Sequence, residues 1–323
     1  MGPVRTVIAT AEPRGAYHLS ALAGAFAAPG HIAHLVPYPE PVQGRCVLPV
    51  THDLDILSAA RRLVVTGGGW SSWTAATAWR AHQLGVELRF VSLADVTCHP
   101  PNDTPRPDLF AARSPRDART VAALHGVAAT QVTVTGTPEL DNLRPWHPDG
   151  SVLLVSTSDL VRRDPQKQLL TAAQQLADNG TRVRVRLHPR EDLALWSNLE
   201  LRSNIELIGA DEPPTTSAAR ASAVLSYPGS LLPTLAAAGP PVVCHTPSTE
   251  LAALLDDTWR SATSTVTTTL DDALTAVTTA APVAPALLDD LVGPRGGARH
   301  RLAAFIHPTS SNAAAQPPNP SAA

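Results

Sequence analysis

The sequence contains almost no lysine. Lys167 is the one lysine among its 25 lysine and arginine residues, and it stands between two glutamines at the start of a helical pattern. A P-loop nucleotide hydrolase requires a lysine after a glycine-rich loop, and a pyridoxal-phosphate enzyme requires a lysine that forms the Schiff base. Because no glycine-rich loop precedes Lys167, we exclude both classes. Arginine, histidine, hydroxyl groups or backbone amides must therefore bind any anion.

Cysteine is also scarce. Cys46, Cys98 and Cys244 are widely spaced and odd in number. They form neither a disulfide framework nor a zinc motif, and a reducing cytoplasm suits them best. We therefore expect a cytoplasmic protein.

The chain lacks a basic excess and a long apolar run. Its formal net charge of -3 argues against a nucleic-acid binder, and no run of apolar residues is long enough to span a membrane. A hydrophobic fraction of 44% and a charged fraction of 16% are typical of a soluble globular protein. With 323 residues, the chain is long enough for about two domains.

Strand-like runs alternate with helical patterns along the whole chain, which predicts an α/β fold with parallel sheets. In the first half we predict strands at residues 6–9, 32–36, 63–66, 86–93, 108–112 and 131–135, and helices at 19–26, 71–82 and 115–125. In the second half we predict strands at residues 152–156, 183–188, 204–208, 223–226 and 242–244, and helices at 165–179, 216–221, 231–238, 270–279, 284–291 and 298–305.

A connector rich in proline and glycine, residues 142–150, separates the two halves. We predict an N-terminal domain over residues 1–148 and a C-terminal domain over 149–307. From residue 308 the composition is serine, asparagine, alanine and proline, which predicts a disordered tail over 308–323.

One stretch combines a strand with a cationic turn. Val183, Val185 and Leu187 alternate with polar residues, and the run ends at Pro189, which cannot donate to a sheet. Open parallel sheets bind ligands at the carboxyl ends of their strands, where His188 is expected. A surface turn with a solvated arginine is the alternative.

A second candidate follows the strand over 63–66, where three glycines precede Trp70. Glycine lets the backbone approach a ligand closely, and the amides of the following helix would face that ligand. A tight structural turn explains the glycines equally well.

Three motifs together resemble the GT-B superfamily. They are Val132-Thr-Val-Thr-Gly-Thr-Pro-Glu-Leu-Asp141, Arg186-Leu-His-Pro189, and Ser226-Tyr-Pro-Gly-Ser230 followed by Gly239-Pro-Pro241. Their order and spacing are similar to those of the superfamily over roughly residues 60 to 245. It contains two-domain glycosyltransferases, non-hydrolysing UDP-N-acetylglucosamine 2-epimerases and CDP-glycerol glycerophosphotransferases.

The resemblance implies two Rossmann-like domains that face each other across a cleft, with the acceptor at the first and the donor nucleotide at the second. It implies transfer of a glycosyl or glycerophosphate group from a nucleotide-activated sugar or polyol to an unidentified acceptor, and leaves peripheral membrane association open. The donor-binding residues that we predict are Arg162, Arg186, His188, Arg190, Ser226, Gly229, Ser230 and Thr234. Those predicted on the acceptor side are Gly67, Gly68, Gly69, Trp70, Gly136 and Thr137.

One position departs from the superfamily. Many GT-B enzymes hold the nucleotide ribose with a glutamate where this chain has Thr234, and a hydroxyl bonds the ribose more weakly than a carboxylate does. Three alternatives therefore stay open: a sugar-nucleotide epimerase, a sialyltransferase that uses a CMP-linked donor, and a non-catalytic protein of GT-B shape.

The transfer needs a base and a site for the leaving phosphate. His18 is the predicted base because it follows the first strand and because the unperturbed pKa of histidine is near neutrality, with Glu12 as second choice. His18 could instead cap the first helix. Backbone amides at Gly229 and Ser230 would stabilise the phosphate.

We predict that neither a metal ion nor another cofactor takes part. The group formed by His52, Asp53 and Asp55 fits no standard set of metal ligands. We interpret it as the solvated start of a helix.

Overall fold

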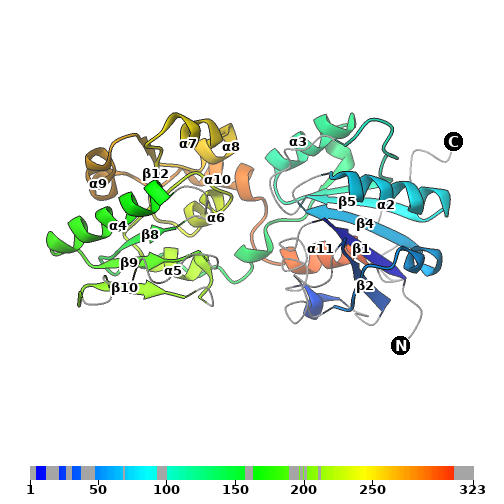
Figure 1. Ribbon diagram of the computed structural model, residues 1–323, viewed down its shortest axis with the longest axis horizontal. Helices are drawn as coiled ribbons and strands as arrows, with labels where there is room; N and C mark the ends of the chain where they lie inside the picture. Colours follow the sequence, from blue (N-terminus) through cyan, green and yellow to red (C-terminus); the bar gives the residue numbers. More distant parts are fainter. Residues whose placement is uncertain are drawn as a thin grey trace. The chain divides into compact units, whose positions relative to one another are not determined.

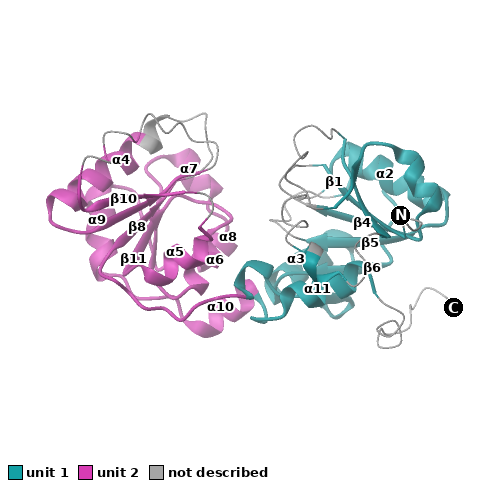
Figure 2. Ribbon diagram, turned by 90° about the horizontal axis from the view of Figure 1, so that it is seen from below, with its two compact units in different colours: residues 1–141, 293–323 teal, residues 142–292 magenta. Residues whose placement is uncertain are grey.

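The chain folds into two compact units, which Figure 2 distinguishes by colour. Unit 1 comprises residues 1–141 and 293–323, and unit 2 comprises residues 142–292. The computed structural model describes residues 5–11, 22–26, 31–37, 48–67, 70–92, 100–156, 163–188, 196, 199, 202–209 and 212–308.

Unit 1 is built on a seven-stranded sheet in which all neighbouring strands are parallel (Figure 1). The strand order is β3-β2-β1-β4-β5-β6-β7. The chain thus runs outward from β1 to β3 and starts again beside β1 at β4, so its direction of travel switches between β1 and β4. The strands are β1 (Thr6–Thr10), β2 (Ile32–Leu35), β3 (Val50–Thr51), β4 (Arg62–Gly67), β5 (Glu87–Ser92), β6 (Leu109–Ala112) and β7 (Val132–Val134).

Helices cover both faces of this sheet. Helices α2 (Ser72–Gln83) and α3 (Pro115–His125) pack on the face that carries Val7 and Ala9, whereas α11 (Ala298–Ile306) packs on the face that carries Ile8. Ser71 caps α2, because its hydroxyl accepts the Thr74 amide at 3.1 Å. Short 3-10 helices are η1 (Ala23–Ala25), η4 (Leu54–Ala59), η5 (Ala129–Gln131) and η6 (Pro138–Leu140).

The predicted helix start near Asp53 is confirmed. Asp53 is the N-cap of η4, and its carboxylate accepts the amide of Asp55 at 2.9 Å. Both residues are exposed. In the described part of the chain, no three histidine, cysteine, aspartate or glutamate side chains gather as metal ligands.

Unit 2 is built on a six-stranded sheet that is also entirely parallel. Its order is β10-β9-β8-β11-β12-β13, so the switch point lies between β8 and β11. The strands are β8 (Val152–Val155), β9 (Val183–Arg186), β10 (Ile205–Ile208), β11 (Ala223–Ser226), β12 (Val242–His245) and β13 (Thr265–Thr267).

The helices of unit 2 enclose its main core on one side of the sheet. Helices α4 (Arg163–Asp178) and α9 (Leu270–Thr279) pack against the face that carries Val183 and Val185. The remaining helices are α5 (Pro214–Arg220), α6 (Leu232–Ala237), α7 (Thr249–Leu254), α8 (Asp257–Ser261) and α10 (Pro285–Val292). None of the helices in the described ranges is both long and apolar enough to cross a bilayer.

The division into units differs from the predicted domains. We expected the second domain to run from 149 to 307, but residues from 293 onward belong to unit 1, and the first crossing follows Asp141 rather than residue 148. The physical reason is that α11 buries its apolar side chains on the unit 1 sheet, beside Ile8 and Val64. The tail predicted to be disordered lies, from residue 309 on, outside the described residues.

Polar contacts fix α11 at both ends. At its start, the Asp141 carboxylate accepts the amides of Ala298 and Arg299 at 2.7 and 2.8 Å, which caps the helix. At its end, the Arg89 guanidinium donates to the carbonyl of Phe305 and lies 5.2 Å from the centre of its ring. Because Arg89 is buried in β5, the helix is tied to the centre of the sheet.

Candidate functional site

Two of the predicted donor-binding residues share one row of the unit 2 sheet. The register pairs Arg186 with Val155, and Val155 with Ser226. Register partners in neighbouring parallel strands point to the same face, so Arg186 and Ser226 lie on one face, two strands apart. Both end their strands, and β8 and β11 flank the switch point. This carboxyl edge is where a sheet of this type binds ligands.

Arg186 is mostly enclosed at this edge. Its side chain is 9% exposed, and its guanidinium donates to the backbone carbonyl of Glu212. His188 lies two residues beyond the end of β9 and is half-buried. Arg162 and Arg190, also predicted to bind the donor, lie outside the described residues.

The loop from β11 to α6 completes the edge. The buried Ser226 hydroxyl donates to the carbonyl of Tyr227 at 3.1 Å, so the fold already uses its proton. Gly229 and Ser230 follow and are half-buried. A Cβ added to Gly229 would meet only the Tyr227 carbonyl oxygen, at 4.0 Å, and the glycine does not have a positive φ. Neither backbone geometry nor packing within the chain requires glycine there.

Thr234 occupies the position where the superfamily often has a glutamate. It is 8% exposed and lies within α6, a helix of six residues that is shorter than predicted. Pro233 stands before it in the first turn.

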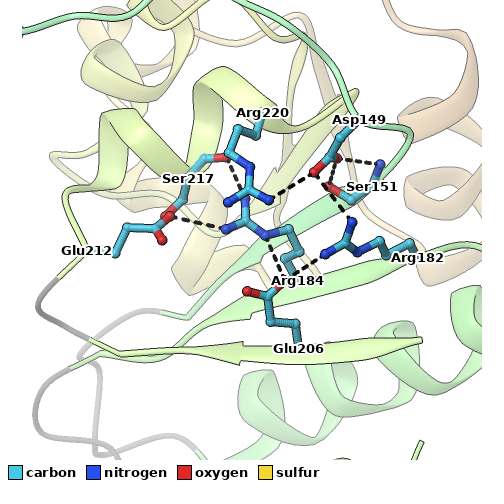
Figure 3. Close-up of polar contacts among 8 residues, drawn as sticks. All are labelled: Asp149, Ser151, Arg182, Arg184, Glu206, Glu212, Ser217 and Arg220. Atoms are coloured by element: carbon cyan, nitrogen blue, oxygen red, sulfur yellow. Dashed lines mark hydrogen bonds and ion pairs between the residues drawn. The ribbon is translucent and has the colours of Figure 1, made fainter. Parts of the chain in front are cut away.

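A network around Arg184 was not predicted from the sequence (Figure 3). The Arg184 side chain has no exposed surface, and it donates to Glu206 at 3.3 Å, to Glu212 at 3.2 Å and to the Ser217 carbonyl at 3.2 Å. The Glu212 carboxylate also accepts the Ser217 hydroxyl at 2.5 Å. A buried guanidinium is tolerated because its donors are satisfied and its charge is paired.

Glu212 links this network to the carboxyl edge. Arg184 binds its carboxylate, and Arg186 binds its backbone carbonyl. The alternation of β9 suggests a strand with one solvated face, but both of its faces are buried. The register partner of Arg184 is Glu206, and this acidic residue in the neighbouring predicted strand was the available signal.

The connector that enters unit 2 joins the same network at Asp149. This carboxylate accepts the hydroxyl and the amide of Ser151 at 2.5 and 3.0 Å, and it pairs with Arg182 and Arg220. Burial by itself would raise the pKa of Asp149, but the Ser151 hydrogen bonds and the arginines outweigh it, so the pKa is lowered. The carboxylate is therefore ionised at neutral pH.

His245 is a further polar residue that sequence reasoning missed. It ends β12 and is buried, with Nε2 at 3.0 Å from Gln168 Oε1 and Nδ1 at 3.3 Å from Thr267 Oγ1. Burial lowers the pKa of His245, and the hydrogen bond with the Thr267 backbone opposes this only in part. A neutral ring that donates from Nε2 satisfies both contacts.

In unit 1, the structure places Trp70 in the core. The ring is 5% exposed, stacks on Phe90 at a centroid distance of 5.7 Å, and donates from Nε1 to His125 Nε2 at 3.4 Å. Burial, followed by the charge of Arg106, lowers the pKa of His125 to about 4, so the imidazole is a neutral acceptor at pH 7. These contacts give Trp70 a packing role, and its assignment to the acceptor side stays a prediction.

Gly136 also has a structural role. Its φ is +87°, and a Cβ at this position would overlap the carbonyl oxygen of Pro294 and lie 2.8 Å from Arg301 Nη2. Arg301 in turn donates to the carbonyls of Thr135 and Pro294 at 2.8 and 3.1 Å. The first resembling motif thus contacts the segment that leads into α11.

The structure describes two of the other residues predicted on the acceptor side, Thr137 and Gly67. Thr137 is buried and precedes η6, and Gly67 ends β4. The predicted bases Glu12 and His18, and the acceptor-side glycines Gly68 and Gly69, lie outside the described residues.

Comparison with known proteins addresses the fold. No protein-family model matches the chain, and no curated protein matches its sequence. Among solved structures, a UDP-GlcNAc 2-epimerase from Methanocaldococcus jannaschii, in complex with UDP-GlcNAc and UDP, is 12% identical with a TM-score of 0.55, covering 94% of this chain and 99% of its own.

Two other solved structures are similar over nearly the whole chain. The glycotransferase of kitacinnamycin is 13% identical with a TM-score of 0.59, covering 95% of this chain and 99% of its own. The wall teichoic acid polymerase TagF, soaked with CDPG, is 11% identical with a TM-score of 0.54, covering 94% of this chain and 87% of its own. With its two all-parallel sheets, the chain has the GT-B fold, as its three motifs indicated.

Proposed function

We propose that this chain transfers a glycosyl or glycerophosphate group from a nucleotide-activated donor to an acceptor hydroxyl. The observation that carries the proposal is the carboxyl edge of the unit 2 sheet, where Arg186 and Ser226 share a face beside the switch point. Two of the solved structures similar in fold are named as a glycotransferase and a polymerase. We place the reaction in the cytoplasm and assign it no metal ion or other cofactor.

The chemistry follows from the negative charge that develops on the leaving nucleotide. When the bond to the transferred group breaks, its electron pair stays with the nucleotide phosphate, which gains negative charge. Arg186 and His188, together with the amides of Gly229 and Ser230, would stabilise that charge. We keep His18 as the base that takes the proton of the acceptor hydroxyl, with Glu12 as second choice.

A sugar-nucleotide epimerase is the second candidate, because several solved structures of the same fold are named as UDP-N-acetylglucosamine 2-epimerases. The two reactions give different products. A transferase releases the free nucleotide and yields a new glycosidic or phosphodiester bond, whereas an epimerase inverts one sugar centre.

Product analysis tests the proposal. The full-length protein is incubated with UDP-, CDP-, CMP-, GDP- and dTDP-linked donors, with and without a mixture of polyol and sugar acceptors, and the products are separated by mass and retention. Release of nucleotide that depends on an acceptor supports transfer. An epimer formed without an acceptor favours the second candidate, and binding without either product indicates a non-catalytic protein.

Replacing His188 by alanine is expected to weaken donor binding by about tenfold or more, because one charge-assisted hydrogen bond contributes about 1.5–3 kcal/mol. Calorimetric titration with a donor that binds the parent measures the change. His147→Ala is the matched control, since His147 is exposed and lies just before the amino end of β8. Equal affinity of the His188 variant and the parent would exclude this residue as a phosphate contact.

Ser230→Asp is expected to keep the melting temperature of the parent and to lower donor affinity by about tenfold or more. An acidic residue near a helix start does not destabilise the helix, but its charge repels a phosphate. Gly229→Ala should also leave the fold intact, because the added Cβ meets no close atom. Differential scanning fluorimetry and titration measure both quantities on one preparation.

Thr269→Asp provides the control for the added charge. Thr269 is the exposed N-cap of α9, two strands away from β11. Aspartate also caps a helix, but here it loses the hydrogen bond that Thr269 donates to Asp272 at 2.6 Å and adds a like charge beside it, so this variant should melt lower than the parent while retaining donor affinity. If Ser230→Asp binds the donor as Thr269→Asp does, the loop between β11 and α6 does not hold the phosphate.

A further inference from the structure

Two buried hydroxyl groups stand side by side at the carboxyl edge of the unit 1 sheet. Thr10 ends β1 and Thr66 is the penultimate residue of β4, and they are 0% and 1% exposed. They are register partners, so both side chains point to one face from strands that are about 4.8 Å apart. Among the residues that the structure describes, neither hydroxyl has a hydrogen-bond partner.

An unpaired buried hydroxyl is unfavourable, and two adjacent ones indicate a polar group that the described residues do not supply. Thr6 shows the ordinary arrangement. It lies on the same strand and the same face, and its Oγ1 is 2.8 Å from His307 Nδ1. The described part of the fold thus supplies a hydrogen-bond partner to the threonine at the amino end of β1, but not to the one at its carboxyl end.

The position of the pair points to a ligand. Strands β1 and β4 flank the switch point of this sheet, where open parallel sheets bind their ligands. Of the charged side chains on this face of β4 and β5, Arg62 and Arg89 both pair with Glu87, at 2.8 and 2.7 Å. Arg89 also donates to the Phe305 carbonyl, and Arg62 and Glu87 lie at the amino ends of their strands, so within the described residues no charged side chain bonds either hydroxyl. This favours a neutral partner over an anion.

We propose that Thr10 and Thr66 form a subsite that binds a hydroxyl group of a neutral sugar or polyol. A threonine hydroxyl both donates and accepts, so the pair can bracket one ligand hydroxyl from two sides. The inference rests on the proposed function, and it names residues that recognise the carbohydrate or polyol part of the substrate. That part is either the acceptor or the transferred group of the donor.

Threonine methyl NMR on the full-length protein tests the subsite. The protein is labelled with ¹³C at threonine methyl groups and titrated with N-acetylglucosamine, glycerol, UDP-N-acetylglucosamine, UDP and sulfate. Saturable shifts of the Thr10 and Thr66 methyls are expected with a sugar or polyol, and none with UDP or sulfate. Shifts with the free sugar or glycerol identify the acceptor, and shifts with UDP-N-acetylglucosamine alone identify the transferred group.

Variants separate recognition from packing. Thr10→Val keeps the side-chain shape, removes one unpaired hydroxyl and should melt no lower than the parent, yet weaken the binding seen at Thr66 by about tenfold. Thr6→Val is the control: it leaves His307 without its partner and should lower stability without changing that binding. If a water molecule bridges the two hydroxyls instead, none of the probes should shift the Thr10 and Thr66 methyls. That result, or equal shifts with sulfate, would overturn the subsite.

The same titration keeps the two proposals apart. The methyl of Thr234 in α6 reports on unit 2, where the nucleotide is proposed to bind. If UDP and every linked donor leave Thr234 unshifted, the donor site fails, whatever the unit 1 methyls show. If Thr234 shifts with a nucleotide while Thr10 and Thr66 respond to no sugar or polyol, the subsite fails and the donor site stands.

Discussion

Arg184→Ala is expected to lower the free energy of unfolding by about 2–5 kcal/mol, because it leaves a cavity in place of a fully buried side chain and removes the cation that pairs with Glu212, whereas Glu206 keeps Arg182. Arg184 is fully buried, and it donates to Glu206, Glu212 and the Ser217 carbonyl (Figure 3). Unfolding in urea, followed by circular dichroism, measures the change. We also expect weaker donor binding, because Glu212 holds Arg186 through its backbone.

Arg182→Ala provides a matched control on the neighbouring chain segment. Its side chain is 50% exposed, and it pairs with Glu206 and Asp149 at 3.2 and 3.8 Å. Exposed ion pairs contribute little, so this variant should lose no more than about 1 kcal/mol. Equal losses in the two variants would contradict the view that burial makes Arg184 essential to unit 2.

Gly136→Ala is expected to cost about 3 kcal/mol or more, since it combines two penalties. A side chain at φ +87° is strained by about 1–2 kcal/mol, and the new Cβ would also overlap the backbone carbonyl of Pro294. The segment that leads into α11 must then move away from residue 136. Hydrogen exchange of the amides of Ala298–Ile306 should accelerate together with the loss of stability.

Gly126→Ala separates strain from overlap. Gly126 ends α3 with φ +63°, and a Cβ there would meet no atom within 4 Å. It should therefore cost only the backbone term of about 1–2 kcal/mol and leave exchange in α11 unchanged. If the two variants lost the same stability, the contact between Gly136 and the α11 segment would carry no weight.

Local signals made several elements predictable. Helix α3 has the predicted bounds, because Ser114 caps it, Pro115 suits its first turn and Gly126 ends it in the left-handed region. Strand β11 and helix α9 also have the predicted bounds. In these stretches the cap or the apolar period alone decides the conformation.

Short elements after β12 were missed. Helices α7 and α8 and strand β13 have six, five and three residues, too few for a periodic pattern to appear. Their caps were present in the sequence, since Ser248 accepts the Leu251 amide and Asp256 accepts the Trp259 amide. Without a periodic run behind it, a capping residue does not distinguish a helix from a turn.

Long-range packing accounts for the larger differences. Arg184 is buried because Glu206 and Glu212, 22 and 28 residues away, converge on it, and no local pattern encodes that convergence. The return of α11 to unit 1 depends in the same way on Asp141, 157 residues before Ala298. Order along the chain predicted a single boundary at the connector, whereas the packed surfaces decide to which unit a helix belongs.

The candidate site was predictable in part. One edge of the unit 2 sheet carries Arg186, Ser226, Gly229 and Ser230. Their position could be predicted because a strand's carboxyl end can be recognised from the sequence. Trp70 was assigned to the acceptor side from the glycine-rich turn before it and Gly136 from the first motif, and both also make packing contacts in the fold. The base His18 stays a prediction, as do the other site residues outside the described ranges.

Hydrogen exchange on the full-length protein, with and without a saturating nucleotide-linked donor, tests the central claim most directly. The donor is whichever member of the UDP-, CDP-, CMP-, GDP- and dTDP-linked panel binds most tightly. We predict slower exchange in the peptides that cover residues 183–188 and 226–232, while those covering α9, on the far side of the unit 2 core, keep their rates. Saturable donor binding that leaves residues 183–188 and 226–232 unprotected would contradict the assignment of this edge as the donor site.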